Sequence, residues 1–342
     1  MRAVAYRTTG ASSVLEPTDL PMPEPAPGEV RVRLVVAGVN PTDWKARAGL
    51  TGPKDLPFDA VVPGQDGAGV VDALGDGVTG LAEGDRVWLY LAQHGRPIGT
   101  AAEYAVVPEA LAVRLPANAS YDVGASLGVP AMTAHRCLTI HEDGPARLAP
   151  GALEGRTVLV TGGAGAVGHA AIQLARWAGA EVVTTISSDA KARLATAAGA
   201  HHVVTYTDGD PAAAIRAVAP DGVDLVVDVA LIQNVELLGA VLKARGSVAA
   251  YANTGGAEAT LPFRAFMSLN ARFQFVLLYT VGEAALGAAA QDVSAAVADG
   301  VLGVGEDAGL PLVRFPLERT AEAHDAVEQG AVGKVLIDIA DA

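Results

Sequence analysis

Thr157-Val-Leu-Val-Thr-Gly-Gly-Ala-Gly-Ala-Val-Gly168 is the stretch of sequence that decides the fold. Its first residues, Val158 to Thr161, predict a buried strand that breaks into glycines. The glycines then follow a GxGxxG spacing, at Gly163, Gly165 and Gly168. An apolar pattern at helical spacing continues beyond them. Strand, glycine turn and helix in this order are typical of a site that binds the pyrophosphate of a dinucleotide.

Each glycine of this pattern is expected to have its own role. The first permits the tight turn, the second lets the backbone approach phosphate without a Cβ, and the third lets the helix pack closely on the strand. The amides that open the helix point at the phosphates, where the helix dipole favours negative charge. We therefore expect the pyrophosphate contacts to fall on Gly163, Ala164, Gly165, Ala166, Val167 and Gly168.

Composition and charge narrow the class of protein. The 342 residues suffice for two domains, and 51% hydrophobic with 18% charged residues is normal for a globular chain. The net charge of −14 argues against nucleic acid and anionic lipid as partners and favours a small neutral substrate. The single cysteine, Cys137, excludes an internal disulfide and a four-thiolate zinc lobe, and its apolar flanks predict a buried thiol. No apolar stretch suits a signal peptide or a membrane span, so we expect a cytoplasmic protein.

The pattern of predicted secondary structure changes after the first third of the chain. Short β-like runs separated by Pro and Gly predict a β-rich domain over residues 1–125, with strands at 3–6, 30–36, 69–74, 86–91 and 102–107. Strands and helices then alternate, which predicts a doubly wound parallel α/β sheet over 126–282, with strands at 158–161, 181–185, 202–205, 225–228, 247–251 and 273–280. Short strands at 313–315 and 335–339 predict that residues 283–342 return to the first domain.

The residue that ends the second strand of such a sheet distinguishes the two pyridine dinucleotides, because a carboxylate there binds the ribose hydroxyls of NAD. Here that position is Ser187, followed by Ser188 and by Lys191 on the next helix. Hydroxyls and a cation favour a 2′-phosphate, so we expect NADPH. The alternative is that Lys191 and Arg193 form a solvated helix face.

The chain resembles the medium-chain dehydrogenase/reductase superfamily, and within it the zinc-free quinone oxidoreductase (ζ-crystallin-like) branch. The resemblance covers nearly the whole chain and rests, beside the glycine turn, on the motifs Ala37-Gly-Val-Asn-Pro-Thr-Asp43, Pro63-Gly-Gln-Asp-Gly-Ala-Gly-Val-Val71, Gly84-Asp-Arg-Val87, Ala102-Glu-Tyr104, Gly128-Val-Pro-Ala-Met-Thr-Ala134 and Gly333-Lys-Val335. It implies a GroES-like catalytic domain joined to a Rossmann NADPH-binding domain. It also implies a homodimer formed through the edge strand predicted at 273–280.

The resemblance further implies chemistry without a metal. The zinc-dependent branch has a cysteine where this chain has Asn40, and a His-Glu pair where it has Gln65 and Asp66. Hydride addition to an isolated carbonyl leaves an alkoxide that needs a Lewis acid or strong donors, whereas a quinone or conjugated enone delocalises the charge itself. The expected reaction is therefore NADPH-dependent reduction of a quinone or of an activated carbon–carbon double bond.

Several site residues follow from the resemblance. Asn40 matches a residue that reaches the nicotinamide ribose and the substrate pocket, although an ordinary Asx turn is the alternative. Thr133 matches a threonine near the nicotinamide, Lys334 a lysine that touches the cofactor, and Tyr206 a tyrosine near the adenosine phosphate. Lys45 stands where the family often has a tyrosine, and it is either a donor to a developing oxyanion or a solvated surface lysine.

Three functions remain open on these grounds. The first is an NADPH:quinone reductase, and the second is an enone or enoyl-thioester reductase on the same scaffold. The third, from another class, is a crystallin-like protein that binds NADPH without catalysis.

Overall fold

The computed structural model describes residues 1–52 and 55–340, and within it the chain divides into two units. The first unit combines Met1–Pro130 with Pro311–Ala342, and the second is Ala131–Leu310. The first part of the predicted C-terminal segment, residues 283–310, therefore belongs to the second unit rather than returning to the first. Its main element, α9 (Glu283–Ala298), carries Asp292, which accepts hydrogen bonds from Arg147 and from the backbone N–H of Leu148 in the same unit.

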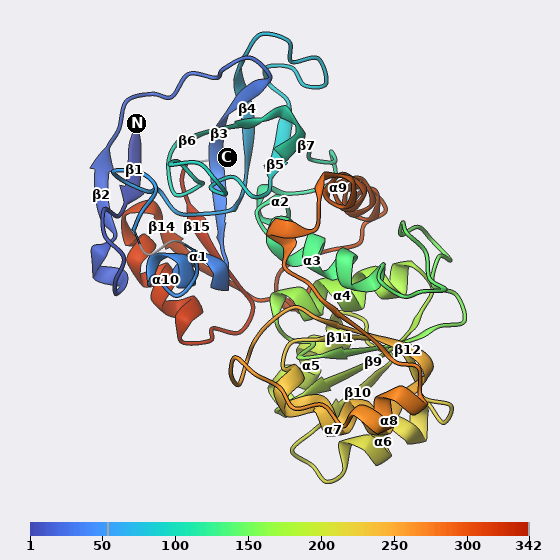
Figure 1. The fold of residues 1–342 in the computed structure, drawn as a ribbon. Coiled ribbons are helices and arrows are strands. Elements are labelled where there is room, and N and C mark those ends of the chain that lie inside the picture. The colour runs from blue at the N-terminus through green and yellow to red at the C-terminus, as the bar shows by residue number, and fades with distance from the viewer. Residues whose placement is uncertain (53–54, 341–342) are drawn as a thin grey trace. The chain divides into compact units, whose positions relative to one another are not determined.

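The second unit is built on a six-stranded, all-parallel sheet in the order β10-β9-β8-β11-β12-β13. The strands are β8 (Thr157–Thr161), β9 (Glu181–Ile186), β10 (His202–Thr205), β11 (Val223–Asp228), β12 (Leu242–Ala250) and β13 (Arg272–Phe275). Figure 1 shows α4 (Ala166–Trp177) on one face of this sheet, and α6 (Pro211–Val218), α7 (Leu231–Val241) and α8 (Phe263–Ser268) on the other. The predicted doubly wound α/β fold is confirmed.

The buried character of these strands follows from their sequence. Val158, Leu159 and Val160 have no exposed surface, as a parallel strand covered by helices on both faces requires. Helix α5 (Asp189–Ala197) begins after Ser188, whose hydroxyl accepts a hydrogen bond from the backbone N–H of Lys191. This N-cap fixes where the chain leaves the end of β9 and enters the helix.

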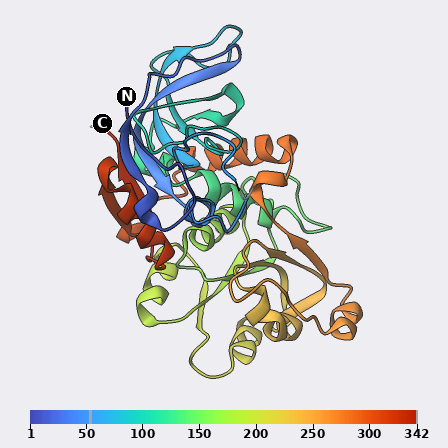
Figure 2. The same cartoon turned by 60° about the vertical axis from the view of Figure 1, so that its left-hand side comes forward.

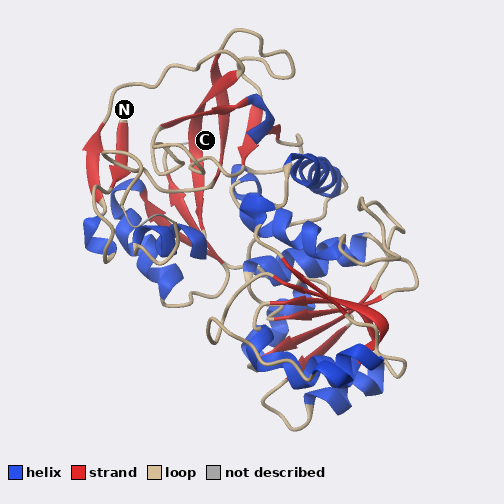
Figure 3. Cartoon of the chain, in the orientation of Figure 1, coloured by secondary structure: helices blue, strands red, loops and turns tan. Residues whose placement is uncertain are grey.

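The first unit contains a seven-stranded sheet and a separate two-stranded one, drawn as red arrows in Figure 3. The larger sheet runs β14-β15-β3-β4-β5-β7, with β6 also paired to β3, and β1 pairs with β2. The strands are β1 (Arg2–Ala5), β2 (Glu16–Asp19), β3 (Glu29–Val39), β4 (Asp66–Leu74), β5 (Arg86–Leu89), β6 (Tyr104–Pro108), β7 (Ala112–Arg114), β14 (Leu312–Pro316) and β15 (Lys334–Asp338). The helices are α1 (Pro41–Arg47), α2 (Tyr121–Gly124), α10 (Thr320–Glu328) and the first turn of α3 (Gly128–Leu138).

The C-terminal strands complete the sheet of the first unit. β15 pairs antiparallel with β3, so that Val335 lies opposite Val39, and β14 pairs parallel with β15. Figure 2 shows this red segment beside the blue N-terminal strands. The pairing places Lys334, the first residue of β15, near the point where β3 ends and α1 begins.

Two details of the strand predictions differ from the structure. The strand predicted at 273–280 is only four residues long, because its register with β12 ends where Ala250 faces Phe275, and residues Leu278–Thr280 form a 3-10 turn. β2 and β7 lie outside the predicted strands. Cys137 is a buried free thiol, as expected, and burial raises its pKa. Within the described ranges, no helix has the length and apolar character needed to cross a bilayer.

Candidate functional site

The glycine turn between β8 and α4 leaves little room for side chains. The residue with positive φ is Gly162, at +70°, so the turn depends on Gly162 rather than on Gly163 as predicted. A Cβ on Gly163 would lie 2.2 Å from Oγ1 of Thr184, whose hydroxyl donates to the carbonyl of Val160. A Cβ on Gly168 would lie 2.4 Å from the carbonyl oxygen of Gly162. These two glycines therefore allow close packing of backbone against the sheet.

Gly165 has a different environment from the other glycines of the turn. It is the N-cap of α4, with φ −84° and ψ 161°, and a Cβ there would meet nothing nearer than the carbonyl oxygen of Gly162 at 3.5 Å. No side chain within the described ranges caps this helix end, so the amides that open α4 at Ala166 and Val167 keep their hydrogen-bonding capacity. Open space beside unpaired helix amides fits an anionic group such as a pyrophosphate.

The residues predicted to contact the adenosine end lie together at the carboxyl ends of β9 and β10. Nζ of Lys191 donates to Oγ of Ser187 at 3.1 Å, and Ser188 caps the same helix. Tyr206 follows β10 directly, and its backbone N–H donates to the carbonyl of Ile186, the residue before Ser187. Ser187 and Lys191 are half-buried, whereas Ser188 and half of Tyr206 are exposed. The structure therefore brings these four residues into one group at the strand ends.

Asp228 is a polar residue of this edge that the sequence analysis missed. It ends β11, is fully buried, and accepts hydrogen bonds from the hydroxyl of Thr161, the backbone N–H of Ala230 and the amide of Asn234. Burial raises the pKa of this carboxyl, and its three donors oppose the shift. The sequence signal that could have identified it is an aspartate directly after the apolar run Leu225-Val-Val227.

In the first unit, Asn40 and Lys334 meet as part of a buried polar network. Nζ of Lys334 donates to Oδ1 of Asn40 at 2.7 Å, and Nδ2 of Asn40 donates to Oδ2 of Asp66 at 2.7 Å. Nζ of Lys334 lies 3.6 Å from the same oxygen of Asp66, which makes the two an ion pair. Burial raises the pKa of Asp66 and lowers the pKa of Lys334, and the attraction between the two groups opposes both shifts.

Asp43 belongs to the same network and was also missed as a functional candidate. Its Oδ2 accepts a hydrogen bond from the backbone N–H of Asn40 at 2.7 Å, at the start of α1. Its Oδ1 is buried and has no hydrogen-bond partner among the described residues. Burial, together with the nearby charge of Asp66, raises the pKa of Asp43 to about 7.

The two other predicted catalytic residues make none of the hydrogen bonds given for this network. Lys45 is half-buried on α1, with Nζ 5.8 Å from the ring centre of Trp44, so its ammonium contacts an aromatic face. Thr133 is buried in α3 and belongs to the second unit, whereas Asn40, Lys45 and Lys334 belong to the first.

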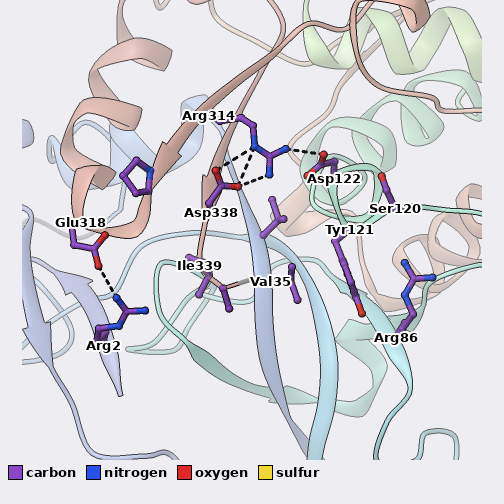
Figure 4. A pocket seen from close by; sticks show the side chains of 13 residues that line it. Arg2, Val35, Arg86, Ser120, Tyr121, Asp122, Arg314, Glu318, Asp338 and Ile339 are labelled. Carbon is purple, nitrogen blue, oxygen red and sulfur yellow. Dashed lines mark hydrogen bonds and ion pairs between the residues drawn. The ribbon is translucent and has the colours of Figure 1, made fainter. Parts of the chain in front are cut away.

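A pocket of about 720 Å³ in the first unit contains none of the predicted site residues. Figure 4 shows that its charged groups pair with one another: Arg314 with Asp338 and Asp122, and Arg2 with Glu318. Arg86, also in its wall, lies 4.6 Å from the ring centre of Tyr121. Because carboxylates already neutralise Arg314 and Arg2, this pocket is a weak candidate for an anion site.

Metal-ligating side chains do not gather in the described part of the chain. Across residues 1–52 and 55–340, no group of three or more His, Cys, Asp or Glu side chains is placed to hold a metal ion. The positions that the sequence analysis compared with zinc ligands carry Asn40, Gln65 and Asp66, and two of these three contact Lys334.

Two family models match the chain. The model described as alcohol dehydrogenase GroES-like domain matches residues 26–117, and the model described as zinc-binding dehydrogenase matches residues 166–294. A quinone oxidoreductase from Lama guanicoe is 30% identical over 98% of this chain and 97% of its own. A 2-haloacrylate reductase from a Burkholderia species is 31% identical over 75% of this chain and 74% of its own.

Solved structures are also similar to this chain over nearly its whole length. The crystal structure of an NAD-dependent alcohol dehydrogenase has a TM-score of 0.85 and 32% identity, and covers 99% of this chain and all of its own. A mycobacterial protein solved in complex with NADPH has a TM-score of 0.81 and 28% identity, with the same coverage.

Proposed function

We propose that this chain catalyses the NADPH-dependent reduction of quinones. It belongs to the quinone oxidoreductase branch of the medium-chain dehydrogenase/reductase superfamily. The observation that carries the choice of cofactor is the contact between Lys191 and Ser187 at the end of β9. An ammonium and a hydroxyl at this position can bind a 2′-phosphate, whereas an NAD site places a carboxylate there.

The geometry of the second unit, taken by itself, suits a bound dinucleotide. The open space at Gly165 and the uncapped amides of α4 suit the pyrophosphate, and the Ser187 group lies at the neighbouring strand ends. In this proposal Gly163, Ala164, Gly165, Ala166, Val167 and Gly168 hold the pyrophosphate, and Ser187, Ser188, Lys191 and Tyr206 hold the adenosine phosphate. NADPH supplies the hydride when it is bound.

The reaction is proposed to need no metal. A quinone spreads the charge that hydride addition creates over its ring, so hydrogen-bond donors suffice to stabilise the product. Asn40 is the proposed donor of the first unit, Lys45 is a second cationic candidate, and Thr133 is the proposed contact of the second unit near the nicotinamide. The remaining task of the protein is to orient the reactants and exclude water.

The test combines cofactor titration with an acceptor panel. Calorimetry on the wild-type protein should give at least about tenfold tighter binding of NADPH than of NADH, which corresponds to ~1.4 kcal/mol. Lys191→Met should abolish that preference, and Lys191→Arg, which keeps the charge, should retain it. Equal affinity of the wild-type protein for both nucleotides, or an unchanged preference in Lys191→Met, would contradict the assignment of NADPH.

The rate of NADPH oxidation with each class of acceptor distinguishes the proposed activity from its alternatives. Oxidation of NADPH should be faster with a panel of quinones than with a panel of enones and 2-haloacrylates. The similarity to a 2-haloacrylate reductase supports reduction of an activated carbon–carbon double bond as the second candidate, and faster turnover of the enone panel would establish it. Tight binding of NADPH without turnover of either panel would favour the non-catalytic alternative.

The proposal also includes a homodimer and a cytoplasmic location. β13 is an edge of the parallel sheet, and the apolar side chains of Phe275, Leu277, Phe263 and Met267 near it are exposed. A second copy of the chain would cover both the edge and these side chains. A reducing compartment such as the cytoplasm suits the free thiol of Cys137.

A further inference from the structure

Asn40, Asp66 and Lys334 form a charged cluster that is closed to solvent. Their exposed fractions are 2%, 0% and 1%, although a carboxylate and an ammonium are among the groups that cost most to bury. Burying a cluster of this kind is costly unless its charges are paired and hydrogen-bonded. The hydrogen bonds and the ion pair of the cluster therefore indicate which side chain it holds in place.

The ammonium of Lys334 makes two hydrogen bonds and one ion pair, all with groups of the first unit. Nζ lies 2.7 Å from Oδ1 of Asn40, 3.3 Å from the carbonyl oxygen of Val39 and 3.6 Å from Oδ2 of Asp66. An ammonium carries three N–H donors and no acceptor. Lys334 thus acts on Asn40 and Asp66 within the first unit.

The side-chain amide of Asn40 is held from both ends. Its carbonyl oxygen accepts from Lys334, and its NH₂ group donates to Asp66 at 2.7 Å. An ammonium can only donate and an ionised carboxylate can only accept, so a flipped amide would face two unfavourable contacts. Nδ2 carries two N–H groups, and one of them donates to Asp66.

The surrounding backbone is shaped to admit this cluster. A Cβ on Gly38 would lie 2.9 Å from Cε of Lys334 and 2.1 Å from the carbonyl oxygen of Ala125. A Cβ on Gly128 would lie 2.1 Å from Oδ1 of Asp66, which accepts a hydrogen bond from the backbone N–H of Val129 at 2.9 Å. Both glycines leave the space that the lysine and the carboxylate occupy.

We propose that Asp66 and Lys334 are positioning residues that lock the Asn40 amide in one orientation, so that its remaining N–H faces the oxygen of the acceptor that becomes negative. This inference rests on the proposed function. A free amide could also present its carbonyl oxygen, which would repel the developing charge. The locked amide presents a donor in every turnover, without a reorientation step.

A double-mutant cycle tests this arrangement. Lys334→Met should lower kcat for quinone reduction about tenfold, and Asn40→Ala should lower it at least as much. Because Lys334 acts through Asn40, adding Lys334→Met to Asn40→Ala should cause no further loss of kcat. Lys243→Met, which removes a lysine paired with Asp224 in the second unit, is the matched control and should leave kcat unchanged.

Cofactor binding gives an independent readout. The affinity of Lys334→Met for NADPH, measured by calorimetry, should stay within about twofold of wild type, because Nζ of Lys334 is engaged by Asn40, Val39 and Asp66 of the first unit. A tenfold loss of NADPH affinity in Lys334→Met, in both the wild-type and the Asn40→Ala backgrounds, would overturn the inference and assign Lys334 to direct cofactor contact. Additive losses of kcat in the cycle would overturn it as well.

A more conservative substitution keeps the proposal testable if Lys334→Met does not fold. Asp66→Asn is isosteric, yet its side chain can either accept from or donate to Asn40, so the amide is then fixed at one end only, by Lys334. We expect a loss of kcat with unchanged affinity for NADPH, and wild-type kcat in a folded Asp66→Asn protein would refute the proposal. Failure of the proposed function has a different signature, since the wild-type protein would then reduce no acceptor of either panel.

Discussion

Gly165→Ala should separate binding of the cofactor from folding of the protein. Gly165 has φ −84° and ψ 161°, a conformation that alanine adopts readily, and the added methyl group would meet only the carbonyl oxygen of Gly162 at 3.5 Å. Alanine is a poorer N-cap than glycine, which destabilises the helix. It also lowers the conformational entropy of the unfolded chain, which stabilises the folded protein by ~0.4–1 kcal/mol. The two effects oppose each other, so the free energy of unfolding should change by less than about 1 kcal/mol.

The same methyl group should strongly weaken binding of NADPH. It would occupy the space beside the amides of α4, where the proposed pyrophosphate approaches the backbone. We expect at least about a tenfold loss of affinity, or ~1.4 kcal/mol, measured by calorimetry alongside urea unfolding. A Gly165→Ala protein that binds NADPH as tightly as wild type would refute the placement of the pyrophosphate.

Two other glycines provide controls for this experiment. Gly168→Ala would place a Cβ 2.4 Å from the carbonyl oxygen of Gly162, so it should destabilise the fold by about 1–3 kcal/mol. Gly287 lies inside α9 with nothing within 4 Å of an added Cβ. Gly287→Ala should therefore stabilise the protein by up to about 1 kcal/mol and leave the affinity for NADPH unchanged.

Two further predictions concern protonation and assembly. The native protein holds a proton on Asp43 up to pH about 7, whereas the unfolded chain releases it near pH 3.8, so this group makes stability fall as pH rises between those values. Asp43→Asn should become more stable relative to wild type across that window, by on the order of 1–4 kcal/mol in urea unfolding, and a constant difference would contradict the burial argument. Phe275 is 69% exposed beside the edge of the sheet, so Phe275→Glu should shift the protein from dimer to monomer in sedimentation experiments. The control Val332→Glu, at an exposed position of the first unit, should leave the assembly unchanged, and a wild-type monomer would refute the dimer.

Local sequence signals were sufficient for most of the fold. The strand before Gly163 and the helix after it follow from short-range periodicity and from the special backbone needs of glycine, and both elements form at the predicted positions. The strand predicted at 273–280 was too long, because the apolar pattern continues after Phe275 although the pairing with β12 ends there. β2, with the sequence Glu-Pro-Thr-Asp, has no local strand signal and depends on its partner β1.

The polar cluster of the first unit was predictable only in part. Asn40 and Lys334 were candidates separately, but their contact joins residues 294 positions apart, and the contact of Asn40 with Asp66 spans 26 positions. Nothing local distinguishes a buried lysine at the start of a strand from an exposed one. The burial of Lys334 depends on the missing Cβ of Gly38, which becomes evident only when β3 and β15 are paired.

The charge balance of the cluster connects its stability with its proposed role. Asp66 and Lys334 cancel each other, so the third ionisable group, Asp43, decides whether the buried set is neutral or carries one negative charge. Below pH about 7, Asp43 holds its proton and the set is neutral, which is the state that burial favours. Ionisation of Asp43 adds a second carboxylate that competes for the ammonium of Lys334, and this weakens the hold of Lys334 on the amide of Asn40. If the amide is the donor to the acceptor, kcat should therefore decline as pH rises through the pKa of Asp43, and Asp43→Asn should remove that decline.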